Sequence, residues 1–168
     1  MNTISRHTLR VARNTLQGGI PNDRYPVEYL TNYRLIYVHP TDAILNLKGF
    51  TLATNDAHFY DAYRGDEKAE GKCISKAGVN FNPSKNTGAG RSFSQADLDL
   101  CFDTNQFYFL YEVVGFDDVY LNFNIYWVPI ATIRDWYNRR GNKGKITLLR
   151  VRQCLAEVEF EQTLEIRD

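Results

Sequence analysis

The sequence contains little cysteine, and its cysteines are not grouped. Cys73, Cys101 and Cys154 lie far apart and form no CxxC pair, which argues against a disulfide framework, a zinc knuckle or a local cysteine–histidine nucleophile. No apolar run approaches the roughly 18 residues that a membrane span requires. The opening residues lack the apolar segment of a secretion signal. These absences predict a protein of the reducing cytoplasm without a membrane segment.

An excess of charge of either sign is also absent. The 20 basic residues balance the 20 acidic ones, so composition gives no support to non-specific nucleic-acid binding, although a basic cleft offset by acids elsewhere stays compatible with it. A hydrophobic content of 43% over 168 residues is typical of a globular chain that buries a core without disulfides. We therefore expect a single domain over residues 1–168.

The first half of the chain predicts helices followed by short strands. Ile4, Val11 and Leu16 recur at helical spacing, so we expect a helix over residues 4–16, with Gly18 and its neighbour as the stop signal. Residues 26–38 fit either a helix or a strand, and we favour a helix because Pro26 suits its first turn. A further helix is expected at 41–49. Three short strands, separated by turn residues, are expected at 50–54, 58–64 and 70–76.

The second half predicts strong strands between two helices. We expect a polar loop at 78–91 and a helix at 92–102. Two strands are expected at 105–115 and 119–129, followed by a helix at 129–141. The two strands are rich in aromatic and β-branched residues, and a proline at the first turn suits the last helix. The pattern leaves the structure of residues 144–168 open. The sum is an α+β (mixed α/β) fold.

Acidic residues and a lysine are concentrated in LATNDAHFYDAYRGDEKAEGKCISK, residues 52–76. Strand alternation places Glu70 and Lys72 on one face, and a hairpin brings Asp56 near the start of that strand. Carboxylates gathered at one point repel one another unless a cation neutralises them. Magnesium (Mg²⁺) does so, since it takes one or two carboxylates, waters and phosphate oxygens.

Lys72 in that position suits stabilisation of an attacking water or of the charge that develops on phosphorus. The stretch therefore predicts metal-assisted hydrolysis of a phosphodiester. The alternative is a solvent-facing ribbon whose acids and lysines form ordinary cross-strand charge pairs. Two neighbouring carboxylates, Asp61 and Glu67, are left open as further members of the metal site.

The order of these motifs resembles the PD-(D/E)xK nuclease superfamily and, within it, the small type II restriction endonucleases similar to PvuII. The resemblance covers roughly residues 41–137 and implies a restriction-endonuclease-like core, a mixed central β-sheet flanked by helices. It implies that Asp56 and Glu70 bind the metal together with the main-chain carbonyl of Gly71, and that Lys72 is the catalytic lysine. Residues 1–40 and 138–168 are then N-terminal and C-terminal segments of the same domain.

The resemblance also implies a DNA-reading segment in SFSQADLD. Gln95 is suited to address adenine, and Asp97 to accept from a cytosine amino group. Ser94 with Asp97 three residues later equally fits helix capping, and the two roles are compatible. Lys85 and Arg91 are expected to contact phosphates, or else to lie in an ordinary solvated loop.

The activity implied by the resemblance is a Mg²⁺-dependent, site-specific double-stranded DNA endonuclease. Such enzymes act as homodimers, because a two-fold symmetric protein reads a palindromic site. The expected helix at 4–16 is a candidate for the dimer contact or the DNA cleft. A repair or RNA-processing nuclease on the same fold and a non-catalytic binding or inhibitor protein remain as alternatives.

Overall fold

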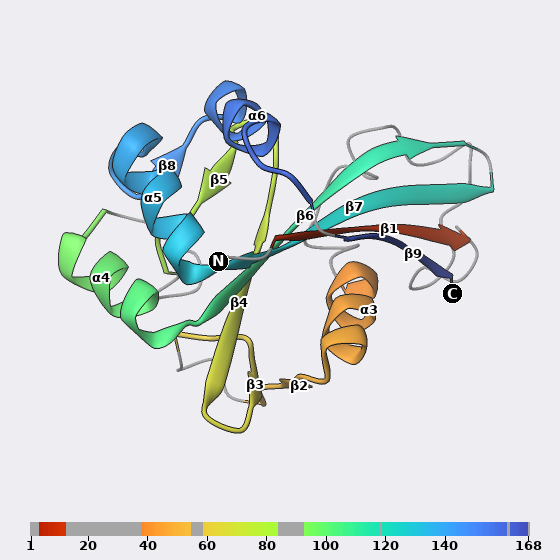
Figure 1. Cartoon of the computed structure of the whole chain (residues 1–168), viewed down its shortest axis with the longest axis horizontal. Helices are drawn as coiled ribbons and strands as arrows, with labels where there is room; N and C mark the ends of the chain where they lie inside the picture. Colours follow the sequence, from red (N-terminus) through yellow and green to blue (C-terminus); the bar gives the residue numbers. More distant parts are fainter. Residues whose placement is uncertain are drawn as a thin grey trace.

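Figure 1 shows a computed structural model of the chain, which describes residues 4–12, 38–54, 59–83, 93–117, 119–160 and 162–167. The expected α+β class is confirmed, since helices flank a mixed β-sheet. The helices are α3 (Val38–Lys48), α4 (Gln95–Thr104), α5 (Ile130–Arg140) and α6 (Leu148–Ala156). The strands are β1 (Ser5–Ala12), β2 (Thr51–Leu52), β3 (Ala62–Arg64), β4 (Glu67–Cys73), β5 (Val79–Asn80), β6 (Phe107–Phe116), β7 (Tyr120–Pro129), β8 (Lys145–Ile146) and β9 (Gln162–Arg167).

The main sheet has seven strands in the order β2-β3-β4-β6-β7-β1-β9, and β5 pairs with β8 in a second, small sheet. The pairs β4/β6 and β1/β9 are parallel, and the other pairs of the main sheet are antiparallel. A parallel pair requires a crossover connection. The chain between β4 and β6 supplies it and contains β5 and α4, so α4 is brought onto the sheet beside β4.

Each face of the sheet has its own hydrophobic core, because successive side chains of a strand point to opposite faces. On one face α3 packs over β1, β6 and β7, through residues such as Ile44, Phe109 and Trp127. On the other face α4, α5 and α6 pack over β4, β6 and β7, through residues such as Tyr108 and Trp136. Figure 1 shows the same division, with α3 on one side of the sheet and the other helices on the opposite side.

Among the described residues from 41 to 141, the expected helices and strands are formed in the expected order, but the polar loop expected at 78–91 contains the strand β5 near its start. The short helix begins at Val38 and ends at Lys48, and Gly49 follows with a φ of 74°, a left-handed conformation that glycine adopts without a steric penalty. The helix after Pro129 ends before Gly141. The two aromatic strands become β6 and β7, the longest strands of the sheet.

The helix expected over residues 4–16 is wrong. Residues 5–12 form β1, which lies between β7 and β9. Ser5, His7, Leu9 and Val11 are all buried, and this every-second-residue pattern is the period of a strand, not of a helix. A dimer contact or DNA cleft built on an N-terminal helix therefore has no basis in residues 5–12. The helix expected over 26–38 lies outside the described residues, apart from the first residue of α3.

The C-terminal segment, residues 144–168, whose type the sequence leaves open, forms β8, then α6 and then β9. In the part of the chain that the structure describes, no helix is long and apolar enough to cross a membrane.

Candidate functional site

Strand β4 presents Glu70 and Lys72 to the face that α4 covers. Ala69 lies in the core under α3, and Ile74 lies in the core under α4, so the two faces alternate along the strand as the sequence predicts. Glu70 pairs in register with Tyr108, and Lys72 with Leu110, both of which belong to the core under α4. Both side chains are only half-buried.

Gly71, between them, faces the opposite core and is covered by an aromatic ring. A Cβ atom built on Gly71 would lie 2.3 Å from Cε2 of Phe109. The Phe109 ring is almost fully buried and is stacked on Trp127, with 6.2 Å between ring centroids. Glycine at position 71 is therefore a packing requirement, and the Phe109 ring covers the strand at the point where a side chain is lacking.

Asp61 is brought to the same point of β4. Its Oδ2 atom accepts the backbone N–H of Gly71 at 2.8 Å, and its own N–H donates to Ala69. The Asp61 carboxylate thus continues the β3–β4 ladder beyond the end of β3. The N–H and C=O of one strand residue point to the same side, so the carbonyl of Gly71 faces the side on which Asp61 lies. We call Asp61, Glu70, Gly71 and Lys72 the β4 site.

The charges of the β4 site act on two neighbouring groups under α4. Burial raises the pKa of the Tyr108 hydroxyl well above its usual value, and the negative charges of Glu70 and Asp61 act in the same direction. Burial also raises the pKa of Cys101 to about 11; Glu70 adds to this increase, and Lys72 opposes it. The negative charges of both carboxylates therefore act on Tyr108, which belongs to the core under α4.

Burial raises the pKa of each of the three cysteine thiols. Burial, followed by the charge of Glu112, raises the pKa of Cys73 to about 12. Cys101, on α4, is raised as described above, and burial also raises the pKa of Cys154. A thiolate is the nucleophilic form of cysteine, and each of these shifts disfavours that form.

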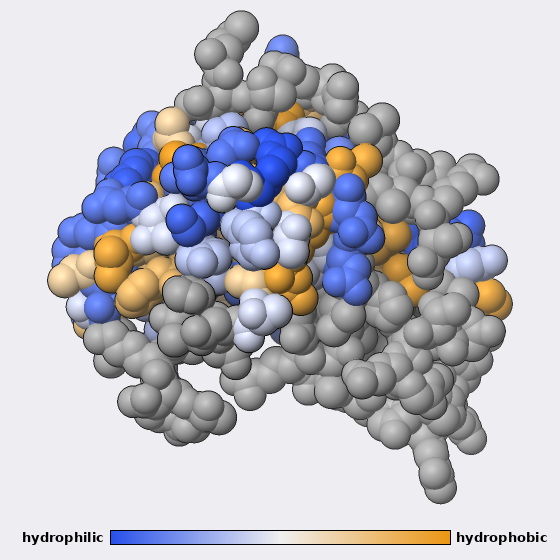
Figure 2. Space-filling view, turned by 90° about the horizontal axis from the view of Figure 1, so that it is seen from below, coloured by the Kyte–Doolittle hydropathy of each residue, from blue (hydrophilic) through white to orange (hydrophobic). Residues whose placement is uncertain are grey.

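Glu67, the other open candidate, is directed elsewhere. It lies at the start of β4 and forms an exposed ion pair with Arg64 at 2.8 Å across the β3–β4 turn. Figure 2 views the molecule from below, the end where Figure 1 draws this turn, and hydrophilic residues there are interspersed with hydrophobic patches. Of the two open carboxylates, Asp61 and not Glu67 is therefore held at the Gly71 amide, next to Glu70 in the chain. Asp56 lies outside the described residues.

The β4 site has the donor chemistry that Mg²⁺ prefers. Two half-buried carboxylates and one main-chain carbonyl are hard oxygen ligands, and Mg²⁺ completes such a set with waters and phosphate oxygens. No group of three or more His, Cys, Asp or Glu side chains gathers in a metal-binding arrangement among the described residues. A cation that uses one or two carboxylates does not require such a group, so the residues present fit Mg²⁺.

The start of α4 combines capping with polar contacts. The Ser94 hydroxyl accepts the backbone N–H of Asp97 at 3.3 Å, so the capping interpretation is confirmed for Ser94. Gln95 is exposed and donates to Asp99 at 2.8 Å. Asp97 is half-buried, and its charge acts on Cys101 together with the charges of Glu70 and Lys72. Of the five expected DNA contacts, Lys85 and Arg91 lie outside the described residues.

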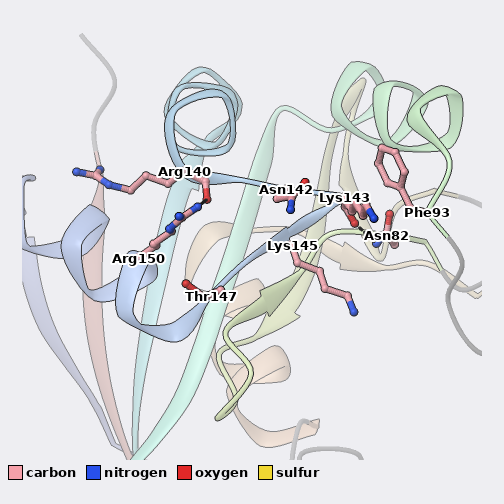
Figure 3. Close-up of a pocket in the computed structure, with 8 residues that line it drawn as sticks. All are labelled: Asn82, Phe93, Arg140, Asn142, Lys143, Lys145, Thr147 and Arg150. Carbon is pink, nitrogen blue, oxygen red and sulfur yellow. Dashed lines mark hydrogen bonds between the residues drawn. The ribbon is translucent and has the colours of Figure 1, made fainter.

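Sequence reasoning missed a hollow of about 630 Å³ beside the turn from α5 to β8. Its lining includes four basic residues, with Asn82 and Phe93 on the α4 side: Arg140, Lys143, Lys145 and Arg150 (Figure 3). We call it the basic hollow. The run RRGNKGK, residues 139–145, is the signal that points to it, since it places three of these four cations, Arg140, Lys143 and Lys145, around a glycine turn.

No protein-family model matches the chain, and comparisons with curated proteins and with solved structures found no match.

Proposed function

We propose that the protein is a Mg²⁺-dependent, site-specific endonuclease of double-stranded DNA. The observation that carries the proposal is the β4 site: Glu70 and Lys72 share one face of β4, and the Asp61 carboxylate is held beside them by the Gly71 amide. Two carboxylates and a lysine at one point are suited to bind a divalent cation and to stabilise charge on a phosphodiester.

The arrangement of elements gives a second line of support. The resemblance to PvuII-like restriction endonucleases rests on an ordered series of a short helix, a hairpin, the acid–x–lysine strand, a polar loop, a helix and a hydrophobic strand. α3, β2, β3, β4, α4 and β6 occur in that order. The acid–x–lysine strand is an interior strand of the sheet, because β3 pairs with its first residues as far as Ala69 and β6 pairs with residues 69–73.

The residues of the β4 site divide the chemistry between them. Asp61, Glu70 and the Gly71 carbonyl would hold the cation, with Asp56 as the further carboxylate that the resemblance implies. A bound Mg²⁺ would supply charge neutralisation of these carboxylates and activation of a water for attack on phosphorus. Lys72 stabilises the negative charge that develops on the phosphate oxygens. Attack by water requires no covalent enzyme intermediate.

Digestion of long phage DNA by the purified protein with Mg²⁺ tests the proposal. We expect discrete bands that disappear with EDTA and in the Asp56→Asn and Glu70→Gln variants. Lys72→Met should lower the cleavage rate by roughly 10²–10³-fold, as does loss of one electrostatic stabiliser elsewhere. Glu67→Gln is the matched control, because Glu67 lies on the same strand but pairs with Arg64, and it should cleave at the wild-type rate.

Other cleavage results would distinguish the alternative functions. A smear that EDTA and Glu70→Gln abolish would keep the nuclease and remove site specificity, as expected of a repair or processing enzyme. Intact DNA with both Mg²⁺ and Mn²⁺ would contradict the proposal and favour the non-catalytic binding protein. The homodimer is part of the proposal because a palindromic site requires two-fold symmetry. Sedimentation equilibrium should accordingly give twice the chain mass of 19.5 kDa.

A further inference from the structure

The basic hollow lies apart from the β4 site and carries charge that its own lining does not neutralise. The guanidinium of Arg140 pairs with Glu157 outside the hollow. Lys143 and Lys145 are exposed and form no ion pair with any described residue, and Arg150 donates to the main-chain carbonyl of Arg140. None of the lining residues is acidic. Three cations around one hollow repel one another, and an anionic ligand would offset that repulsion.

The turn that carries the two lysines is held in one conformation. Asn142 and Lys145 exchange two backbone hydrogen bonds, and Lys143 and Gly144 both have positive φ, 50° and 81°. Turns of this kind favour asparagine, aspartate or glycine at the first central position, so a lysine there adopts a conformation that its side chain disfavours. A strained residue at a fixed turn is an indication of a functional constraint.

The Asn82 side chain also holds this turn in place. This side chain is almost fully buried and donates from Nδ2 to the Lys143 carbonyl at 3.0 Å, while its Oδ1 has no hydrogen-bond partner among the described residues. The N–H of Gly144 donates to the Tyr137 hydroxyl at 2.9 Å. The backbone under the lysines is therefore anchored to α5 and to the chain after β5, and a ligand would not have to order it.

The hollow adjoins the start of α4. Phe93, which lines it and is 42% exposed, immediately precedes the Ser94 cap. In Figure 3 Phe93 stands at the α4 side of the hollow and Arg150 at the opposite side, with the lysine turn between them. A polyanion bound along these cations would thus pass the N-terminal end of α4, where Gln95 is exposed.

We propose that the basic hollow binds the phosphodiester backbone of DNA outside the bond that is cut. The inference rests on the proposed function for the identity of the polymer. It assigns Lys143, Lys145 and Arg150 to phosphate contacts, which fix the position of the duplex and carry no sequence information. Phosphate contacts release condensed counterions, so they are recognised by the salt dependence of binding.

Fluorescence anisotropy of a labelled 20-base-pair duplex in EDTA, over a series of salt concentrations, measures this contact without cleavage. The test variant is Lys143→Asn with Lys145→Gln, since asparagine tolerates positive φ and the turn is kept. We expect the slope of log Kobs against log salt to fall in magnitude by about 2 and the affinity to fall on the order of tenfold. Lys143→Arg with Lys145→Arg should retain the wild-type slope.

The single substitution Lys145→Gln is compared with the control Arg10→Gln. The control also removes one exposed cation, but from β1, which lies away from α5 and β8 (Figure 1). Only Lys145→Gln should change the slope. An unchanged slope in the double variant would overturn the proposal even if Mg²⁺-dependent cleavage is found, and so would a wild-type protein that does not bind the duplex. Binding of inorganic phosphate that the double variant loses, together with an unchanged salt slope for DNA in that variant, would overturn it in favour of a free-phosphate site. A reduced slope without any cleavage would keep the hollow as a DNA contact and remove the nuclease.

Discussion

Glu70 and Lys72 are separated by a residue without a side chain, and the reason lies on the opposite face of the sheet. The space that a Cβ of Gly71 would occupy is filled by the Phe109 ring, which Trp127 holds in place. The same glycine supplies the amide that binds Asp61. Gly71 therefore has two roles. Its lack of a side chain leaves room for the Phe109 ring on one face of the sheet, and its N–H positions the Asp61 carboxylate.

Substitution of Gly71 by alanine should destabilise the protein by about 1–3 kcal/mol, as overpacking of a core does. The added Cβ has to displace a stacked, buried ring and not the end of a flexible side chain. Urea unfolding followed by circular dichroism measures the change.

Gly115→Ala in β6 is the matched control, because the nearest atom to its Cβ, Nδ2 of Asn122, is 3.9 Å away. We expect that substitution to change the free energy of unfolding by less than about 0.5 kcal/mol. Equal effects of the two substitutions would contradict the packing argument.

The sequence identifies the residue types of the site better than their positions. Glu70 and Lys72 follow from strand alternation alone, which is local. Asp61 does not, because its approach to Gly71 depends on where β3 stops pairing, and the pattern gives no sign that the side chain replaces a backbone acceptor. The basic hollow is missed for a similar reason: Phe93 and Asn82 meet the turn at residues 142–145 only through tertiary packing.

At the scale of elements, prediction succeeds where a local signal and burial agree. β6 and β7 are aromatic and β-branched, and α5 begins after a proline and ends before a glycine, so propensity and capping indicate the same structure. β1 contains arginines and a threonine between its buried residues, and its apolar residues also fit a helical spacing. Its position between β7 and the distant β9 decides the outcome, and a local window contains neither partner.

The capping and DNA-reading roles of Ser94 are separable by substitution. Ser94→Ala removes the acceptor for the Asp97 N–H and should destabilise the protein by about 1 kcal/mol, whereas Ser94→Asp retains a capping oxygen and should cost little. Thermal unfolding measures both.

Cleavage or binding assays on the same variants then address DNA. If Ser94 serves only as a cap, Ser94→Asp should bind the duplex as the wild type does, apart from the effect of one added negative charge. If its hydroxyl also contacts a base, Ser94→Asp should keep stability and lose affinity for the cognate site. A stable Ser94→Ala variant would contradict the capping role itself.

At the scale of the whole molecule, a small polar group lies within the apolar core under α3. His7 is fully buried in β1, and its Nε2 lies 2.9 Å from the Ser5 hydroxyl. Nζ of Lys48, at the end of α3, donates to the same hydroxyl at 3.1 Å. Burial, followed by the charge of Lys48, lowers the pKa of His7 to about 4. Because β1 lies between β7 and β9, protonation of His7 would place a charge in the interior of the main sheet.

The stability of the fold should therefore fall as the pH falls from about 6.5 to about 4. In that window the unfolded chain binds a proton at His7 and the folded chain does not, so protonation favours the unfolded state. Below the folded pKa both states are protonated and His7 contributes no further loss. The full shift corresponds to about 3 kcal/mol.

Urea unfolding at pH 7.5, 6.5, 5.5 and 4.5 should show this decline in the wild type. His7→Gln, which does not titrate, should be less stable at pH 7.5 but should show a shallower decline. Parallel declines in the two proteins would mean that carboxylates, and not His7, cause the loss of stability in acid.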